Sequence, residues 1–465
     1  MSDSNTPTQL YSQSYLDQYD EQGVLRCTCG REHHLKTRQI LLGEGLVEKM
    51  PDLLEERCGT RARIWVLSDQ NTEEAAGRRC KEALSRFSPA GIVLPAEPRP
   101  RTTADLIRSL SGEAGSGSPD LILAVGSGTI SDVAKMVSRN LEIPSWCVPT
   151  AASVDAYTSG TSALKLPHRH KTEPAYPSEV VIADLTVLER SPQRLLLSGI
   201  GDLLAKYLSF LDWRLSALIT GEYICDQVAG LCLASARQAL ASVKKLSSDR
   251  KAAVRSLTDA VLLSGLAMQA LISSRPASSA EHTIAHFWEL DHVVGNTDLE
   301  LHGLLVGLSS RILLLLYREF YGNSSFWGFD LEDSLRRLDS EPSWEKALTP
   351  EVKLFHQQIR EEMEARRINP AIYRSRLENA REHRESIANM AGELLAELEK
   401  AVSVLEDISY PFHLSDYRID PQRALVPIRF IRFLRDRYSS FNLIHEVGAE
   451  EWMLELLGQR IGLIS

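Results

Sequence analysis

Short apolar runs alternate with longer amphipathic segments from about residue 38 to residue 192. The apolar runs lie at 62–69, 91–95, 120–126, 145–150 and 179–188. Runs of this length predict strands, and the amphipathic segments between them predict helices. Strands that alternate with helices indicate βαβ units and a largely parallel sheet.

After Pro192 the pattern changes, and amphipathic helices are predicted almost to the end of the chain. The predicted helices lie at 201–218, 224–245, 252–272, 280–290, 300–320 and, as one long charged helix, 377–405. We therefore expect three parts, namely a polar N-terminal segment (1–35), an α/β domain (36–192) and an all-α domain (193–465).

Composition narrows the function classes. A chain of 465 residues with 43% hydrophobic and 25% charged residues is typical of a globular protein with more than one core. A net charge of −10 argues against a nucleic-acid partner. We expect no secretory signal and no membrane-spanning segment. Seven cysteines form no disulfide framework, so a cytoplasmic location is expected.

Two predicted strands end in residues suited to a nucleotide. Asp69 ends the run at 62–69, where a carboxylate accepts hydrogen bonds from a ribose; capping of the following turn is the equally open alternative. The run at 120–126 leads into GSGTISD, whose glycines and following helix start favour an anion site. A Ser- and Thr-rich turn after the run at 145–150 is a further candidate for ligand contacts.

Histidines gather between residues 282 and 302. His282 and His286 are spaced i,i+4, which on a helix presents both rings on one face and suits a divalent metal. The alternative is an ordinary amphipathic helix with hydrogen-bonded histidines. The other candidate metal motif is CTCGREHH, with Cys27 and Cys29. Its Cys-x-Cys spacing and the lack of a second cysteine pair favour no metal there.

Eight stretches, taken together and in order, resemble the sn-glycerol-1-phosphate dehydrogenases, within the wider superfamily of metal-dependent alcohol and glycerol dehydrogenases and dehydroquinate synthase. They are CTCGREHH, SDQNT, GSGTISD, PTAASVDAYTS, GDLLAKY, SRPASSAEHTIAHFWE, LHG and RDRYSSFNL. The resemblance implies a Rossmann-like nucleotide-binding domain at 36–192, a helical metal- and substrate-binding domain at 193–465, and an active site in the cleft between them.

The resemblance also implies the site residues. One divalent metal, Zn²⁺ or Ni²⁺ with Fe²⁺ as a further choice, is bound by the catalytic set of Asp202, His282 and His302. Substrate contacts fall on Asp155, Asp202 and His286, and Arg275 and Lys206 beside the ligands are our candidates for a phosphate. The cofactor contacts are expected at Asp69, Gly126, Ser127, Gly128, Thr129, Ile130, Thr150, Ser153 and Ser159.

The implied activity is the reversible, NAD(P)H-dependent reduction of dihydroxyacetone phosphate to sn-glycerol 1-phosphate by a homodimer. NADH is expected to be preferred and NADPH accepted, because Asp69 repels a 2′-phosphate. Two rivals are a polyol dehydrogenase of the same superfamily and a metal-dependent lyase of the dehydroquinate synthase kind. The family usually has glycine where this chain has Ala156 and Ser279, which border the expected substrate pocket.

Overall fold

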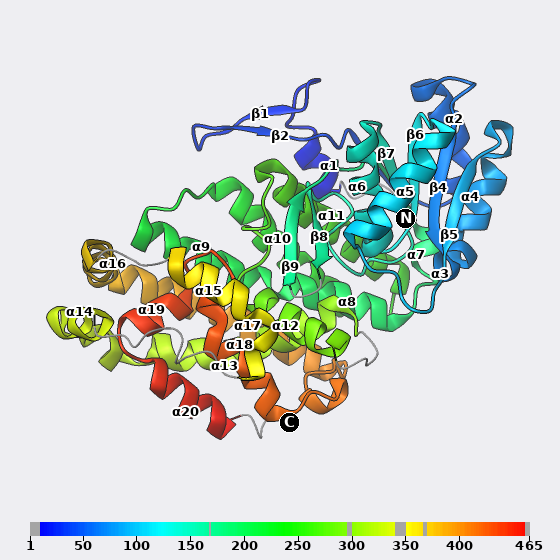
Figure 1. Cartoon of the computed structure of the whole chain (residues 1–465). Helices are drawn as coiled ribbons and strands as arrows, with labels where there is room; N and C mark the ends of the chain where they lie inside the picture. Colours follow the sequence, from blue (N-terminus) through cyan, green and yellow to red (C-terminus); the bar gives the residue numbers. More distant parts are fainter. Residues whose placement is uncertain (1–9, 167–168, 295–299, 340–349, 366–369, 461–465) are drawn as a thin grey trace, which may run out of the picture. The chain divides into compact units, whose positions relative to one another are not determined.

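The computed structural model describes residues 10–166, 169–294, 300–339, 350–365 and 370–460, and its elements form two compact units (Figure 1). The first unit comprises the described chain up to Leu166, Lys171–Leu203 and Gly230–Ser274. The second comprises His170, Leu204–Ala229 and the chain from Arg275 onward.

A six-stranded, all-parallel sheet organises the first unit. In spatial order its strands are β3 (Gln39–Gly43), β10 (Val180–Asp184), β7 (Ser145–Pro149), β6 (Leu121–Gly126), β4 (Ile64–Asp69) and β5 (Ala90–Leu94). Every residue of the four inner strands is buried, whereas the two edge strands are partly exposed. Burial on both faces explains why the inner strands are continuous apolar runs.

Helices and two small hairpins complete the first unit. One face of the sheet packs its side chains against α2 and α4, with Val47, Leu54 and Cys80 in the shared core. The strands outside the sheet are β1 (Val24–Arg26), β2 (Glu32–His34), β8 (Thr161–Leu166) and β9 (Arg169–Pro174). Its helices are α1 (Tyr11–Leu16), α2 (Leu46–Cys58), α3 (Gln70–Thr72), α4 (Arg78–Ala83), α5 (Ala104–Gly117), α6 (Gly128–Leu141), α7 (Leu185–Leu188), most of α8 (Gln193–Leu204) and α11 (Arg250–Leu271).

Apart from Arg169 and His170 of β9, the regular elements of the second unit's described residues are helices, and α10 (Asp226–Val243) begins in it and ends in the first unit. None of the described helices combines the length and apolar character needed to cross a membrane. The helices of the second unit are α9 (Lys206–Thr220), α12 (Ala280–Val294), α13 (His302–Gly322), α14 (Leu331–Asp339), α15 (His356–Ala365), α16 (Pro370–Glu382), α17 (Arg384–Asp407), α18 (Pro421–Leu434), α19 (Ser440–Glu446) and α20 (Glu450–Arg460).

The predicted fold class, a parallel α/β region followed by an all-α region, is confirmed. The details differ in several places. The helix expected at 201–218 is divided at Ala205 between α8 and α9. The edge strand β3 was not predicted, because five residues with one buried position give a weak pattern. The helix expected at 377–405 is interrupted at His383, whose backbone (φ −93°, ψ 8°) separates α16 from α17. The domain boundaries at residues 35 and 192 stay predictions.

Candidate active site

Four histidines come together in the second unit. His282 and His286 lie one turn apart on α12, and His302 is the first residue of α13. The ring centroid of His302 is 5.3 Å from that of His282 and 5.1 Å from that of His286. His170, the second residue of β9, stacks on His286 at 4.4 Å. The two histidines spaced i,i+4 on α12 are therefore part of a larger cluster of imidazole rings.

Buried carboxylates orient two of these rings. Glu281 Oε1 lies 2.9 Å from Nδ1 of His282, and Glu289 Oε1 lies 2.5 Å from Nδ1 of His302. A carboxylate only accepts hydrogen bonds, so each Nδ1 carries the proton and each Nε2 presents a lone pair. Burial opposes ionisation of Glu281, but its hydrogen bond with His282 leads the effects that bring its pKa below the ordinary value.

His286 has a different environment. Burial, together with the neighbouring His170 and His302, lowers its pKa well below the ordinary value. A neutral imidazole at this position donates one hydrogen bond and accepts another, which suits contact with a hydroxyl or carbonyl group. His286 is therefore better suited to exchange hydrogen bonds with an uncharged substrate group than to carry a positive charge.

In the first unit, the turn after β7 is fastened to α8. The backbone N–H of Asp155 donates to Oδ2 of Asp202 at 3.1 Å, and Ser198 Oγ donates to the Ser153 carbonyl at 3.1 Å. A Cβ at Gly199 would lie 2.0 Å from the Ala152 carbonyl oxygen, so only glycine allows this approach. The sequence GIGD thus sets the buried Asp202 carboxylate beside the 151–160 turn.

The same turn is fastened from α11 and α6. Ser264 Oγ donates to Oδ2 of Asp155 at 2.7 Å, and Gln269 donates to the Thr158 carbonyl at 2.5 Å. The fully buried Lys135 donates to the carbonyls of Ala156 and Thr161, at 2.8 Å each. These contacts fix the Asp155 carboxylate, and they bury Ser153 and Ser159 within the turn.

The predicted nucleotide-binding residues lie at one edge of the sheet, because all strands are parallel. Asp69 ends β4, Gly126 ends β6 and Thr150 follows β7. Asp69 also caps α3, with Oδ1 accepting from the Thr72 N–H at 2.8 Å, so the capping alternative is confirmed for one carboxylate oxygen. Helix α6 begins at Gly128, and the three residues at its start, Ser127, Gly128 and Thr129, are partly exposed.

Three arginines surround the loop before α12. Arg435 Nη2 donates to Ser278 Oγ at 3.0 Å, and Arg437 Nη1 donates to the Ser278 carbonyl at 2.9 Å. Burial lowers the pKa of Arg435 to about 10, with Glu281 opposing this and Arg275 adding to it. Burial and the charges of Arg435 and Arg275 lower the pKa of Arg437. This arginine cluster, called the positive region below, lies four residues before His282 and also contains the carboxylates of Glu222 and Glu281.

The two cations predicted from sequence are engaged within the protein. Arg275 forms a two-pronged ion pair with Glu222, at 2.9 and 3.0 Å, and donates to the Tyr438 carbonyl at 3.0 Å. The fully buried Lys206 donates to the Ala277 carbonyl at 3.1 Å. Both side chains therefore support the segment around the 276–279 loop through these contacts.

Comparisons with known proteins identify the relationship. A family model described as iron-containing alcohol dehydrogenase matches residues 41–192. A glycerol-1-phosphate dehydrogenase [NAD(P)+] from Bacillus licheniformis is 32% identical over 315 residues, covering 66% of this chain and 78% of the relative. The chain belongs to the glycerol-1-phosphate dehydrogenase family.

A second glycerol-1-phosphate dehydrogenase, from Metallosphaera sedula, is 31% identical over 280 residues and covers 60% of this chain and 77% of the relative. The crystal structure of a probable glycerol dehydrogenase from Sinorhizobium meliloti 1021 superposes with a TM-score of 0.55 at 17% identity, covering 91% of this chain and 98% of that one. At that identity the likeness concerns the fold.

The donor set fits the divalent metal that membership of the glycerol-1-phosphate dehydrogenase family implies. Within the second unit, His282 and His302 offer donor atoms within 4.8 Å of each other, and each ring is braced at Nδ1 by a carboxylate. Metal-binding histidines usually have such a brace. Asp202, in the first unit, presents a buried carboxylate. Two imidazoles and one carboxylate suit Zn²⁺, Ni²⁺ or Fe²⁺ alike.

Sequence reasoning missed several residues around the glycerol-1-phosphate dehydrogenase site. It gave no role to Arg435 and Arg437, although RDRYSSFNL was among the motifs that carried the resemblance. It also missed Glu281 and Glu289, whose partners were already named. A carboxylate directly before a candidate histidine was an available signal for Glu281, whereas Glu289 is thirteen positions from His302 and needed the fold.

Proposed function

We propose that this chain catalyses the reversible, NAD(P)H-dependent reduction of dihydroxyacetone phosphate to sn-glycerol 1-phosphate. The observation that carries the proposal is the pair of imidazoles whose Nδ1 atoms are held by buried carboxylates, in a chain related to glycerol-1-phosphate dehydrogenases over most of their length. Both Nε2 atoms are thereby prepared to bind a cation before substrate arrives.

We assign the metal to Asp202, His282 and His302, as expected from sequence. When bound there, a divalent cation would supply a Lewis acid for a carbonyl oxygen that becomes negative as hydride arrives. Glu281 and Glu289 keep the imidazole rings in the tautomer that ligation requires. Asp202 is oriented on its other side by the Asp155 N–H.

Asp155 and His286 are assigned to the substrate. Ser264 holds the Asp155 carboxylate, so its remaining acceptor capacity has a fixed direction toward a substrate hydroxyl. The lowered pKa of His286 favours a neutral ring that exchanges hydrogen bonds with a hydroxyl group without adding charge. Ala156 and Ser279 differ from the usual glycines of the family. Ser279 is occupied by a 2.6 Å hydrogen bond to Asp212.

The phosphate group is assigned to the positive region around Ser278. Arg435 and Arg437 gather there despite mutual repulsion and a net charge of −10 for the chain, and a dianion would relieve that repulsion. Arg275 and Lys206, predicted as direct donors, are proposed to act here by supporting the loop as well as through their charge.

The cofactor is assigned to the carboxyl edge of the sheet. Asp69 would accept from the adenosine ribose. The pyrophosphate would lie at the 126–130 turn, against the N–H groups that begin α6. Thr150, Ser153 and Ser159 would border the nicotinamide end. NADH is proposed as the preferred form and NADPH as an accepted one. A homodimeric, cytoplasmic enzyme is proposed on family grounds.

One assay tests the proposal against its two rivals. Oxidation of NADH is followed with dihydroxyacetone phosphate or dihydroxyacetone, before and after chelation and after return of Zn²⁺, Ni²⁺ or Fe²⁺. We expect metal-dependent NADH consumption that strongly prefers the phosphorylated ketone. Equal kcat/KM for both ketones would favour a polyol dehydrogenase, and no net NADH consumption would favour a lyase.

A further inference from the structure

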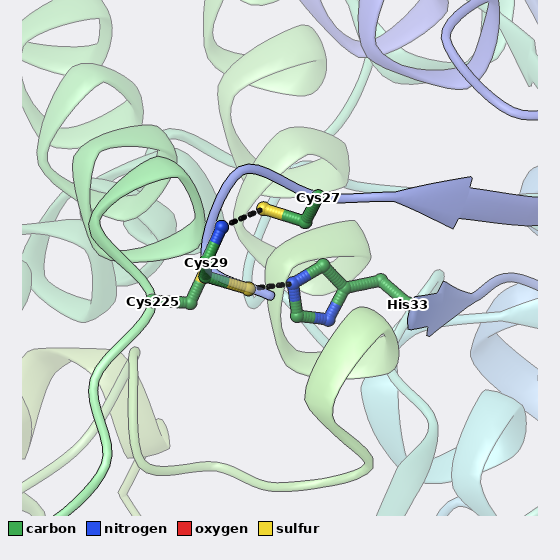
Figure 2. A group of neighbouring side chains, drawn as sticks. All are labelled: Cys27, Cys29, His33 and Cys225. Carbon is green, nitrogen blue, oxygen red and sulfur yellow. Dashed lines mark hydrogen bonds between the residues drawn. The ribbon is translucent and has the colours of Figure 1, made fainter. Parts of the chain in front are cut away.

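The motif CTCGREHH forms a compact group of metal-binding side chains far along the chain from the proposed catalytic ligands. Cys27 lies at the end of β1, Cys29 in the turn and His33 on β2 (Figure 2). One donor atom from each lies within 4.8 Å of the other two. Cys29 Sγ is 3.4 Å from Nε2 of His33. Separations of this size are what ligands of one small metal ion show.

The turn is built to bring both sulfurs to one side. Gly30 N–H donates to the Cys27 carbonyl at 3.0 Å, and Gly30 has φ +83°, a conformation that favours glycine. The Cys29 N–H points at Cys27 Sγ, 3.5 Å away, and a backbone donor aimed at sulfur stabilises a thiolate. The Cys-x-Cys-Gly turn thus brings its two thiols together with one residue between the cysteines, where zinc motifs usually have two.

His33 presents the correct ring nitrogen to this group. Its Nδ1 lies 3.2 Å from the carbonyl oxygen of Ala270 on α11, and a carbonyl only accepts. Nδ1 therefore carries the proton, and Nε2 turns a lone pair toward Cys29 Sγ. The ring is only 2% exposed, so the orientation is fixed by packing as well as by this hydrogen bond.

We propose that Cys27, Cys29 and His33 bind a second, structural Zn²⁺ ion. The two thiols release their protons to solvent on binding, so two thiolates and a neutral imidazole balance the charge of the cation. Three or four N/S ligands and a braced histidine are typical of a structural zinc site.

The consequence of this site would be to fasten the β1–β2 hairpin to the end of α11. The segment after His33 already meets Gln269, whose side-chain oxygen accepts from the N–H groups of Lys36 and Thr37. The amide nitrogen of the same Gln269 donates to the Thr158 carbonyl in the turn that holds Asp155. A metal ion at the hairpin would therefore stabilise Gln269, which holds the turn that contains Asp155.

Metal content of the full-length protein gives the first test. Elemental analysis is expected to find two metal equivalents per chain in the wild type, one in His282→Ala, one in Cys27→Ser/Cys29→Ser, and two in the matched control Cys58→Ser. Cys58 is a partly buried cysteine on α2, outside the group. A single equivalent in the wild type that disappears in His282→Ala would overturn the second site while leaving the proposed function intact.

Cobalt spectroscopy identifies the ligands independently of activity. Co²⁺-loaded wild type and His282→Ala are both expected to show a thiolate-to-Co²⁺ charge-transfer band, which a site of imidazoles and a carboxylate cannot produce. The double cysteine variant should lack the band, and the control Cys58→Ser should keep it. Absence of the band in loaded wild type would overturn the proposal.

A titration of the wild-type protein tests the site without requiring the double variant to fold. A mercurial that blocks thiolates is titrated into the zinc-loaded protein while released Zn²⁺ is measured with a chromogenic chelator. We expect one equivalent to be released early in the titration, because burial raises the pKa of Cys80 and of Cys147 to about 12 and keeps those thiols unreactive. Modification of Cys27 and Cys29, identified by mass spectrometry, without zinc release would contradict the site.

Discussion

The two units use different means to prepare a ligand site. In the first unit most candidate contacts are backbone groups, hydroxyls, glycines and the Asp69 carboxylate at strand ends, and the positions of these strand ends follow from a parallel sheet. In the second they are ionisable side chains held by other ionisable side chains, such as His302 by Glu289 and His282 by Glu281. The first arrangement tolerates loss of one contact, whereas the second leaves a buried charge or ring unsupported when one partner is removed.

The largest effect is expected for His302→Ala. Loss of a proposed ligand should remove the catalytic metal equivalent and lower kcat by roughly 10²–10³-fold or more, as loss of transition-state charge stabilisation does. Elemental analysis and the NADH assay measure both. His292→Ala, another histidine of α12, is the control and should keep metal and activity. The reverse pattern would refute the ligand assignment.

The second-largest effect is expected for Glu289→Gln. Glutamine keeps the shape of the brace but lacks the charge, so metal affinity should fall about 10- to 100-fold while the protein stays folded. Competition with a chelator measures the affinity. The same substitution at Glu319, an exposed residue of α13 paired with Arg460, serves as control. Unchanged affinity in Glu289→Gln would show that the brace is dispensable.

Arg435→Ala tests the positive region. Loss of a hydrogen bond to a charged group is worth about 1.5–3 kcal/mol, which corresponds to a rise in KM for dihydroxyacetone phosphate of roughly 10- to 100-fold. Metal content and the KM for dihydroxyacetone should not change. Arg429, exposed on α18, gives the matched control. An equal loss with both ketones would point to a structural role.

The smallest effect is expected in the first unit, for Asp69→Asn. Asparagine keeps the oxygen that caps α3 but removes the charge, so thermal stability should be nearly unchanged. Discrimination against NADPH should weaken by a few-fold, on the order of 1 kcal/mol or less for one partly screened charge. The ratio of kcat/KM values for NADH and NADPH measures this. An unaltered ratio would leave Asp69 with the capping role alone.

The same contrast explains how much could be predicted from sequence. The inner strands and the edge that carries Asp69, Gly126 and Thr150 follow from apolar runs of regular spacing, because burial on both faces leaves a local pattern. The histidines of α12 and α13 were accessible through spacing and family motifs. Short edge strands such as β3 carry too few buried positions to be recognised.

What could not be predicted depends on contacts between distant segments. Arg435 meets Ser278 across 157 positions, and nothing near either residue indicates the pairing. His33 is similar, because its partner is the carbonyl of Ala270, and a backbone acceptor has no sequence signature. Spacing rules alone therefore argued against a metal at the cysteine turn, whereas the orientation of one imidazole supports it.

The buried Lys135 has a consequence for anyone who wishes to redesign the pocket. Its ammonium group fills the concave side of the 156–161 backbone and is itself paired with Asp132. The shape of that backbone thus depends on Lys135 of α6, which precedes Ala156 by 21 positions in the chain. Transplanting the turn into a related scaffold, or shuffling it between homologues, should succeed only when Asp132 and Lys135 are transferred with it as a single module.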